Sequence, residues 1–87
     1  MDDSAILDEL MEILLQTGVS IRHEELGGNG GGLCKLTGRE VCFIDTDSEP
    51  SHNAEVCAEA INKLIDIELI YMRPQTREFL TQNKHFK

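Results

Sequence analysis

Apolar residues recur at three- and four-residue intervals near the start of the chain, which is the spacing of one face of an α-helix. The pattern predicts a helix over Asp3–Thr17, and its apolar positions are Ile6, Leu7, Leu10, Met11, Ile13 and Leu14. Asp3 or Ser4 suits the N-cap, and Gly18 suits the position after the last turn, because glycine adopts a left-handed conformation at low cost. Leu15 widens the apolar surface, so we expect this helix to pack against more than one neighbour.

The next segments have the alternating or short continuous apolar patterns of β-strands. We expect strands over Val19–Glu24, Leu33–Leu36 and Val41–Asp45. A short turn around Gly38 separates the last two, which predicts a β-hairpin.

The register of this hairpin decides where two cysteines lie. If Gly38 and Arg39 form a two-residue turn, Cys34 faces Phe43 across the hairpin. A slip of one residue would instead place Cys34 opposite Cys42, because such a slip moves every side chain of a strand to the other face.

Helical spacing returns in the second half of the chain. It predicts one helix over Ser51–Ile65 and another from Gln75 to about Thr81. The apolar run Leu69–Met72 lies between them and leads into Arg73-Pro74; because the residue before a proline prefers an extended backbone, we interpret this run as a short fourth strand. The order α-β-β-β-α-β-α predicts an α+β fold with an antiparallel-rich sheet of three to four strands and helices packed on one face.

Composition places the chain among small single domains. Its 87 residues are predicted to form one domain over 1–87, with few aromatic side chains and therefore an aliphatic core. The three cysteines, Cys34, Cys42 and Cys57, are odd in number and lack C-x-x-C spacing, which indicates reduced thiols rather than a disulfide framework. The acidic start and the lack of a long apolar run favour a cytoplasmic protein without a membrane partner.

The charge of the chain is unevenly distributed. The net charge is −8, with 15 acidic and 4 basic residues before Leu69 but 1 acidic and 4 basic residues after it. An acidic body repels nucleic acid, so we expect no nucleic-acid partner and expect the basic C-terminal stretch to pair with acidic surface. The first five elements resemble double-stranded-RNA-binding domains in order only, since acidic residues stand where that family needs lysines.

The Gly27–Gly32 segment contains five of the seven glycines. It lacks the Lys-Ser/Thr of a P-loop, and a predicted strand follows it where a dinucleotide fingerprint needs a helix. Two interpretations stay open. The segment is a mobile connection, or it is a cradle in which backbone amides bind an anion or small ligand; its residues would be Gly28, Asn29, Gly30, Gly31 and Gly32.

An acidic loop follows the last strand of the hairpin. Asp45, Asp47 and Glu49 are weak candidates for holding Mg²⁺ or Ca²⁺, and the loop superficially resembles the nucleophile loop of haloacid-dehalogenase-type phosphatases. That fold needs a much longer chain, and a calcium loop would need glycine where Pro50 stands. We therefore expect a solvated loop that caps the following helix, and neither a metal nor a cofactor.

The stretch from Gly27 to Asp47 resembles small bacterial proteins without an assigned function, so the resemblance implies no activity. A thiol of Cys34 or Cys42 with His23 as base is conceivable chemistry, but a core cysteine is the ordinary interpretation. The sequence favours a non-enzymatic module that acts by protein–protein interaction, self-association or regulation. The alternative is a ligand-binding or minimal enzyme-like domain that uses the Gly27–Gly32 loop.

Overall fold

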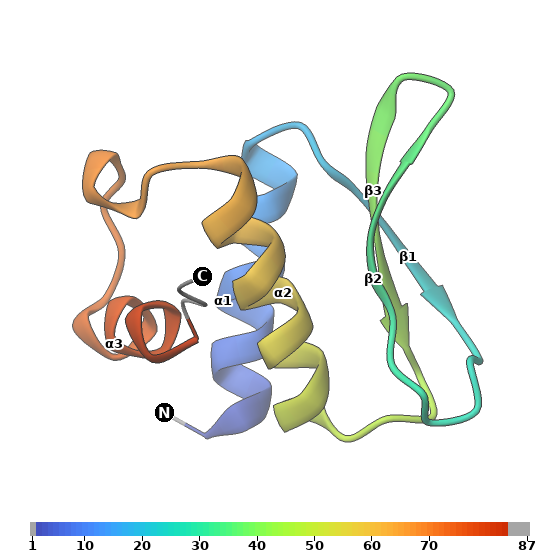
Figure 1. Cartoon of the computed structure of the whole chain (residues 1–87). Helices are drawn as coiled ribbons and strands as arrows, with labels where there is room; N and C mark the ends of the chain where they lie inside the picture. The colour runs from blue at the N-terminus through green and yellow to red at the C-terminus, as the bar shows by residue number, and fades with distance from the viewer. Residues whose placement is uncertain (1, 84–87) are drawn as a thin grey trace.

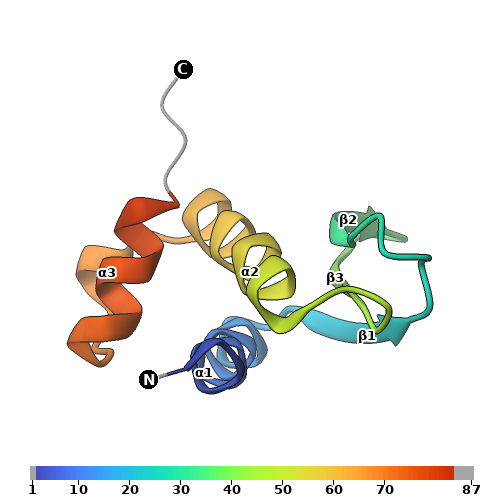
Figure 2. The same cartoon turned by 90° about the horizontal axis from the view of Figure 1, so that it is seen from below.

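Two helices, α1 and α2, lie side by side between a three-stranded sheet and a third helix, α3 (Figure 1 and Figure 2). The computed structural model describes residues 2–83. The elements in chain order are α1 (Asp3–Gln16), β1 (Ser20–Glu24), β2 (Gly32–Leu36), β3 (Arg39–Asp45), α2 (Pro50–Leu64), a 3₁₀ helix η1 (Ile67–Leu69) and α3 (Pro74–Gln82). The predicted α+β class is confirmed, and the helices lie on one face of the sheet as expected.

Local signals set the ends of α1 close to the predicted positions. The N-cap is Asp2 rather than Asp3 or Ser4, and its carboxylate accepts a hydrogen bond from the amide of Ala5 at 2.8 Å. At the other end Gly18 has a φ of 92°, which a glycine adopts without steric cost.

The strand order is β1-β3-β2, with β1 parallel and β2 antiparallel to the central strand β3. The sheet is therefore mixed, with one parallel and one antiparallel pair, whereas the order of the elements had predicted an antiparallel-rich sheet. Because β1 and β3 are parallel, their last residues, Glu24 and Asp45, are partners in the ladder. The loops that follow these two strands consequently leave the sheet at the same end.

The hairpin register differs from the predicted one. Thr37 and Gly38 form the turn with φ values of 51° and 79°, the positive values that a two-residue type I′ turn requires. Cys34 therefore pairs with Val41 rather than with Phe43, and it does not face Cys42. The error arose because the turn begins one residue earlier, at a threonine that rarely adopts this conformation.

The predicted fourth strand over Leu69–Met72 does not form. Its first residue belongs to η1, and the backbone that follows is extended at Ile70 but pairs with no strand within residues 2–83. The segment crosses the helical side of the molecule, far from the sheet (Figure 1). The local sequence therefore favours an extended backbone, but no strand within residues 2–83 lies beside it to pair with. Burial of Ile67 and Met72 holds the segment against the helices instead.

The core is aliphatic, as the composition predicts, and it extends on both sides of α1 and α2, toward the sheet and toward α3. Its buried members are Leu10, Ile13, Leu14, Val19, Cys42, Ile44, Ala54, Cys57, Ala58, Ala60, Ile61, Ile67, Met72 and Leu80. Cys42 of β3 and Cys57 of α2 meet inside it as free thiols. The hydrogen bond between the two thiols and burial together raise the pKa of Cys57, so this side chain stays a neutral thiol.

The expected pairing of the basic C-terminal stretch with acidic surface is confirmed at two positions. Arg73 lies 3.7 Å from Glu9 of α1, and Arg77 lies 3.5 Å from Glu68. The other two basic residues of this stretch, Lys84 and Lys87, lie outside the described residues. Within residues 2–83, none of the helices has both the length and the apolar character that crossing a membrane demands.

Candidate functional site

The glycine loop and the acidic loop meet at the carboxylate of Asp45. This side chain is fully buried, and both of its oxygens accept two hydrogen bonds. Oδ1 accepts from the amides of Leu26 at 3.0 Å and Asp47 at 2.8 Å. Oδ2 accepts from the amide of Gly30 at 2.9 Å and from the hydroxyl of Ser48 at 2.9 Å. One side chain thus fixes the loop after β1 and the loop after β3.

The backbone of Asp45 is held as firmly as its side chain. Its carbonyl accepts a hydrogen bond from Nδ2 of the buried Asn53 at 2.9 Å, and its amide donates to Oδ1 of Asn53 at 3.3 Å. Asn53 belongs to the first turn of α2. The end of β3, both loops and the start of α2 therefore form one hydrogen-bonded unit.

Burial and the surrounding hydrogen-bond donors both change the pKa of Asp45. Burial disfavours the charged form and raises the pKa, but the donors from Gly30, Asp47, Leu26 and Ser48 act in the opposite direction and prevail. The pKa is lowered to about 2, so the side chain is a carboxylate at neutral pH. A carboxylate that accepts several backbone hydrogen bonds is acceptor-only and is stabilised in that form.

Two positions of the loop favour glycine, Gly30 through its positive φ and Gly31 through close approach to backbone. A side chain on Gly30 would run into the imidazole of His52, and Gly30 also has a φ of 83°. A side chain on Gly31 would overlap the backbone carbonyl of Phe43. These glycines allow the loop to pack directly against β3 and α2.

The five residues predicted to form a cradle, Gly28–Gly32, make different contacts within the chain. Gly30 donates to Asp45, and Gly32 begins β2 opposite Phe43. Asn29 donates to the carbonyl of Leu26 at 3.4 Å, while Gly28 and Gly31 pass close to backbone atoms of Asp47 and Phe43.

The amides of the loop are already directed at carboxylates of the chain itself. Gly27 donates to Asp47 at 2.9 Å, alongside the amides that bind Asp45. The hollow beside Gly31 and Gly32 measures about 90 Å³, which is small against the roughly 300–1,000 Å³ of ligand pockets. Ligand binding by Gly28–Gly32 stays a prediction, and an external anion would have to displace an internal one.

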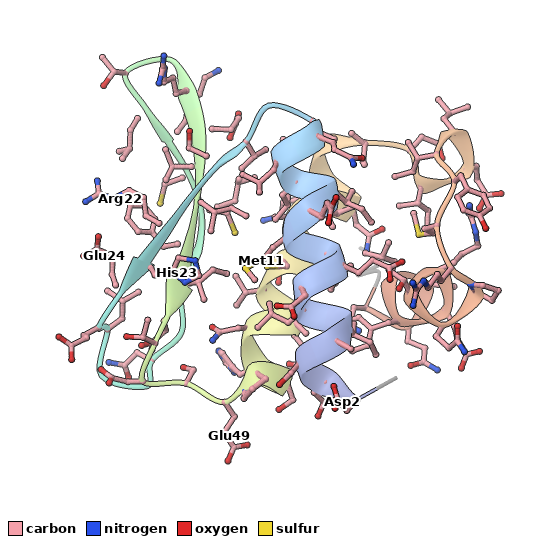
Figure 3. The ribbon with its side chains drawn as sticks, turned by 180° about the vertical axis from the view of Figure 1, so that it is seen from behind. Asp2, Met11, Arg22, His23, Glu24 and Glu49 are labelled. Atoms are coloured by element: carbon pink, nitrogen blue, oxygen red, sulfur yellow. The ribbon has the colours of Figure 1, made fainter. Side chains whose placement is uncertain are left out.

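The weak metal candidates are brought together only in part. Asp45 and Asp47 share the loop junction, but their oxygens accept hydrogen bonds from amides. Glu49 is exposed and points away from the glycine loop (Figure 3). No group of three His, Cys, Asp or Glu side chains suited to a metal ion occurs within residues 2–83.

The thiols are not arranged for nucleophilic catalysis with His23. Leu33 pairs with Cys42 and Cys34 pairs with Val41, so the two cysteines lie on opposite faces of the sheet. Cys42 is buried against Cys57, whereas His23 is exposed and pairs with Ile44.

A second candidate site lies on the surface, in a groove between α1 and β1. It has a volume of about 520 Å³, and its lining residues include Met11, Leu15, Ile21 and His23. Met11 and His23 point toward each other across it (Figure 3). Leu15 is 58% exposed and adds to the apolar lining, so the groove joins several apolar side chains into one exposed surface. Sequence reasoning missed this groove, although Leu15 had been recognised as widening the apolar face of the helix.

The groove runs along an unpaired sheet edge. In the order β1-β3-β2, the strand β1 has a neighbour on one side only among the strands of residues 2–83. The carbonyl of Glu24 bonds to the amide of Thr46 at 2.9 Å, on the β3 side. Backbone groups alternate in direction along a strand, so those of Ile21 and His23 face the free edge beside the groove.

Acidic residues form the rim of the groove. Asp8 and Glu12, both exposed on α1, stand beside its apolar lining. The opposite face of the sheet is different: the guanidinium of Arg22 lies 5.7 Å from the centre of the Phe43 ring and 3.0 Å from Glu24. Arg22 and Glu24 point away from α1 (Figure 3). The Phe43 ring on that outer face is thus partly covered by Arg22, while Leu36 of β2 stays 43% exposed on the same face.

A cleft of similar volume, about 560 Å³, opens at the far end of the sheet. It lies between the last residues of α1 and α2 and the β2–β3 turn, and its lining is more polar than that of the groove. Its lining residues Thr17, Gly18, Gly38 and Arg39 are exposed, and they belong to a helix end and a turn rather than to a free strand edge.

No protein-family model matches the chain, and neither a curated protein nor a solved structure matches it. The functional argument therefore rests on the geometry of the groove and of the loop junction.

Proposed function

We propose that this protein is an interaction module that binds an extended, basic segment of a protein partner by adding it as a strand to the β1 edge. The observation that carries the proposal is the coincidence of an unpaired strand edge with an apolar groove of about 520 Å³. In strand addition, main-chain hydrogen bonds supply affinity, while pockets for alternate side chains supply specificity.

The groove can receive every second side chain of such a segment. The backbone groups of Ile21 and His23 are available to the partner's backbone, and Met11 and Leu15 face the same space from α1. Alternate side chains of an added strand point to the same face of the sheet, here toward α1. Apolar residues at these positions would cover Leu15 and remove its surface from water.

Charge sets the second requirement for the partner. Asp8 and Glu12 lie at the rim, and the whole chain has a net charge of −8. Basic residues flanking the apolar positions would meet these carboxylates, and the long-range field would speed association. This contribution is screened by salt, so binding should weaken as ionic strength rises.

The setting we propose is the cytoplasm of a bacterium, where the protein acts in a regulatory rather than a catalytic role. The three free thiols support a reducing compartment, since such compartments preserve thiols. The bacterial assignment rests on the resemblance of the Gly27–Asp47 stretch.

The alternative function, ligand binding at Gly28–Gly32, has weaker support. The amides of Leu26, Gly27 and Gly30 bind Asp45 and Asp47, and displacing these carboxylates would leave Asp45 buried without partners. The loop therefore has the geometry of an anion nest whose anion belongs to the chain.

The test is a titration of the isotope-labelled full chain with a short lysine–valine peptide, in which two central alternate positions are valine, the flanking positions of the same face are lysine and the residues between them are serine, followed by backbone amide chemical shifts. We expect saturable shifts along β1 that weaken with salt, and no response to a matched peptide of glutamate and valine. Leu15→Asp should abolish the shifts, whereas Leu36→Asp, at an exposed position of β2, should preserve them. Shifts centred on Gly28–Gly32, or none at all, would contradict the proposal.

A further inference from the structure

The segment that follows η1 exposes two large apolar side chains. Leu69 is 81% exposed and Tyr71 is 95% exposed, whereas Met72 is buried in the core and Ile70 is partly buried. This alternation is that of a strand with one face on the helices and one face in water. The extended backbone at Ile70 agrees with that description.

Arg77 holds this segment in place. Its guanidinium donates to the carbonyl of Ile67 at 2.9 Å and to the carbonyl of Ile70 at 2.8 Å. Because successive backbone groups alternate in direction, those of Tyr71 point to the edge that faces away from Arg77. The amide and carbonyl of Tyr71 have no hydrogen-bond partner among residues 2–83. This extended segment therefore leaves the backbone groups of Tyr71 open to a partner, while the amide of Arg73, the next one on the same side, donates to Oε1 of Glu9 at 3.4 Å.

The segment has the chemistry that the groove requires. Leu69 and Tyr71 are apolar side chains two residues apart, and Arg73 continues the same alternation. The guanidinium of Arg73 lies 3.7 Å from Glu9 and the Arg73 side chain is 68% exposed, so this ion pair is weak and the guanidinium can turn to other carboxylates while the backbone amide of Arg73 stays bonded to Glu9. Asp8 and Glu12 at the rim of the groove are such carboxylates.

The segment cannot reach the groove of its own chain. The segment lies on the side of α1 that faces α3, whereas β1 lies on the opposite side of α1 (Figure 1 and Figure 2). The hollow that includes Tyr71 and the groove beside β1 share only Glu12 and Gln16, which stand on the exposed ridge of α1 between them. Any pairing of the two surfaces is therefore intermolecular.

We propose that the Leu69–Arg73 segment of one copy adds to the β1 edge of a second copy, with Tyr71 in the groove and Arg73 at its acidic rim. This inference rests on the proposed function, because it names a second copy as a partner. The contact is head-to-tail, so it propagates into a filament unless the rotation between copies closes a ring. The small contact and the like charge of the copies make it weak, with association that strengthens as salt screens the overall repulsion.

The test uses two variants of the full chain at exposed positions, so that folding is preserved. Leu15→Asp disables the groove and Tyr71→Asp disables the segment, while Leu36→Asp is the matched control. Sedimentation velocity over a range of concentrations should show a rising average mass for the wild type and the control, and single chains for each variant alone. An equimolar mixture of the two variants should reach twice the mass of one chain and stop there, because each copy retains one working surface.

Three results would overturn the inference. If Leu15→Asp associates like the wild type, the groove does not hold the segment of a second copy and the inference fails. If the wild type stays a single chain at millimolar concentration while the lysine–valine peptide still binds β1, the inference fails and the proposed function stands. If neither association nor peptide binding occurs, both fail.

Discussion

The carboxylate of Asp45 accepts a hydrogen bond from the amide of Gly30 at 2.9 Å, and this contact joins the loop after β1 to the end of β3. Parallel pairing of the two strands makes it possible, because Glu24 and Asp45 end their strands side by side. The glycine loop is thus shaped around a charge that the chain itself supplies. This arrangement explains why so many glycines occur together without a phosphate-binding motif.

Asp45→Asn is expected to destabilise the protein more than Asp47→Asn. The amide group of asparagine has one acceptor oxygen in place of two, so at least one of the amides of Leu26, Gly30 and Asp47 loses its partner in a buried site. Asp47 is exposed and accepts a single hydrogen bond from Gly27, which water can replace. Thermal unfolding of both variants measures the difference. Equal melting temperatures would show that the buried carboxylate does not hold the loops.

Acid is expected to weaken the fold through the same group. The pKa of Asp45 is lowered from 3.8 to about 2, so its stabilising contribution is complete above the ordinary value and is lost as pH falls from about 4 toward 2. Urea unfolding at a series of pH values should show the free energy of unfolding of wild type and Asp45→Asn converging over this range. A gap between the two proteins that stays constant down to pH 2 would contradict the assignment.

Two neighbouring glycines offer a matched comparison. Gly31→Ala would place a methyl group on the carbonyl of Phe43, and overpacking of this kind costs about 1–3 kcal/mol in the free energy of unfolding. Gly32→Ala meets no atom within 4 Å, so it should change stability by less than about 1 kcal/mol, in the stabilising direction. Chemical denaturation of the two variants provides the measurement, and the reverse order would mean that the loop does not contact β3 as described.

Thr76 in the first turn of α3 is fully buried, and its hydroxyl has no hydrogen-bond partner among residues 2–83. Thr76→Val replaces that hydroxyl with a methyl group of similar shape, so the free energy of unfolding should stay unchanged or rise by up to about 1 kcal/mol. Thr76→Ala removes the methyl group as well and should lower it by about 1 kcal/mol. If valine destabilises as much as alanine, the hydroxyl has a bound water or another partner.

Sequence reasoning succeeded where a local pattern dictates the structure. The spacing of apolar residues, together with Gly18 and Pro74, placed all three helices to within about two residues. It failed where the structure depends on contacts between residues far apart in the sequence. The parallel pairing of β1 with β3 and the lack of a partner for Leu69–Met72 depend on which segments meet after folding.

The candidate sites divide in the same way. Asp45 was expected in a solvated loop that caps α2, and this expectation is wrong: Asp45 is fully buried, and the N-cap residue Glu49 makes no side-chain cap hydrogen bond. Its role as an internal acceptor depends on Gly30 and Leu26, which approach because β1 is parallel to β3. The groove depends on α1 lying beside the free edge of β1. The wide apolar face that includes Leu15 was the one local sign of it.

The parallel pairing of β1 also bears on the order in which the strands detach. β2 and β3 are joined across a two-residue turn, whereas Ser20 pairs with Val41 across a much longer loop whose closure costs more entropy. Backbone amides of β1 should therefore exchange with solvent through local opening more readily than those of β3. The strand that offers its edge to a partner is then the one that the sheet holds least firmly. A bound partner would hold β1 on its second edge, and amide hydrogen exchange along β1 would become slower.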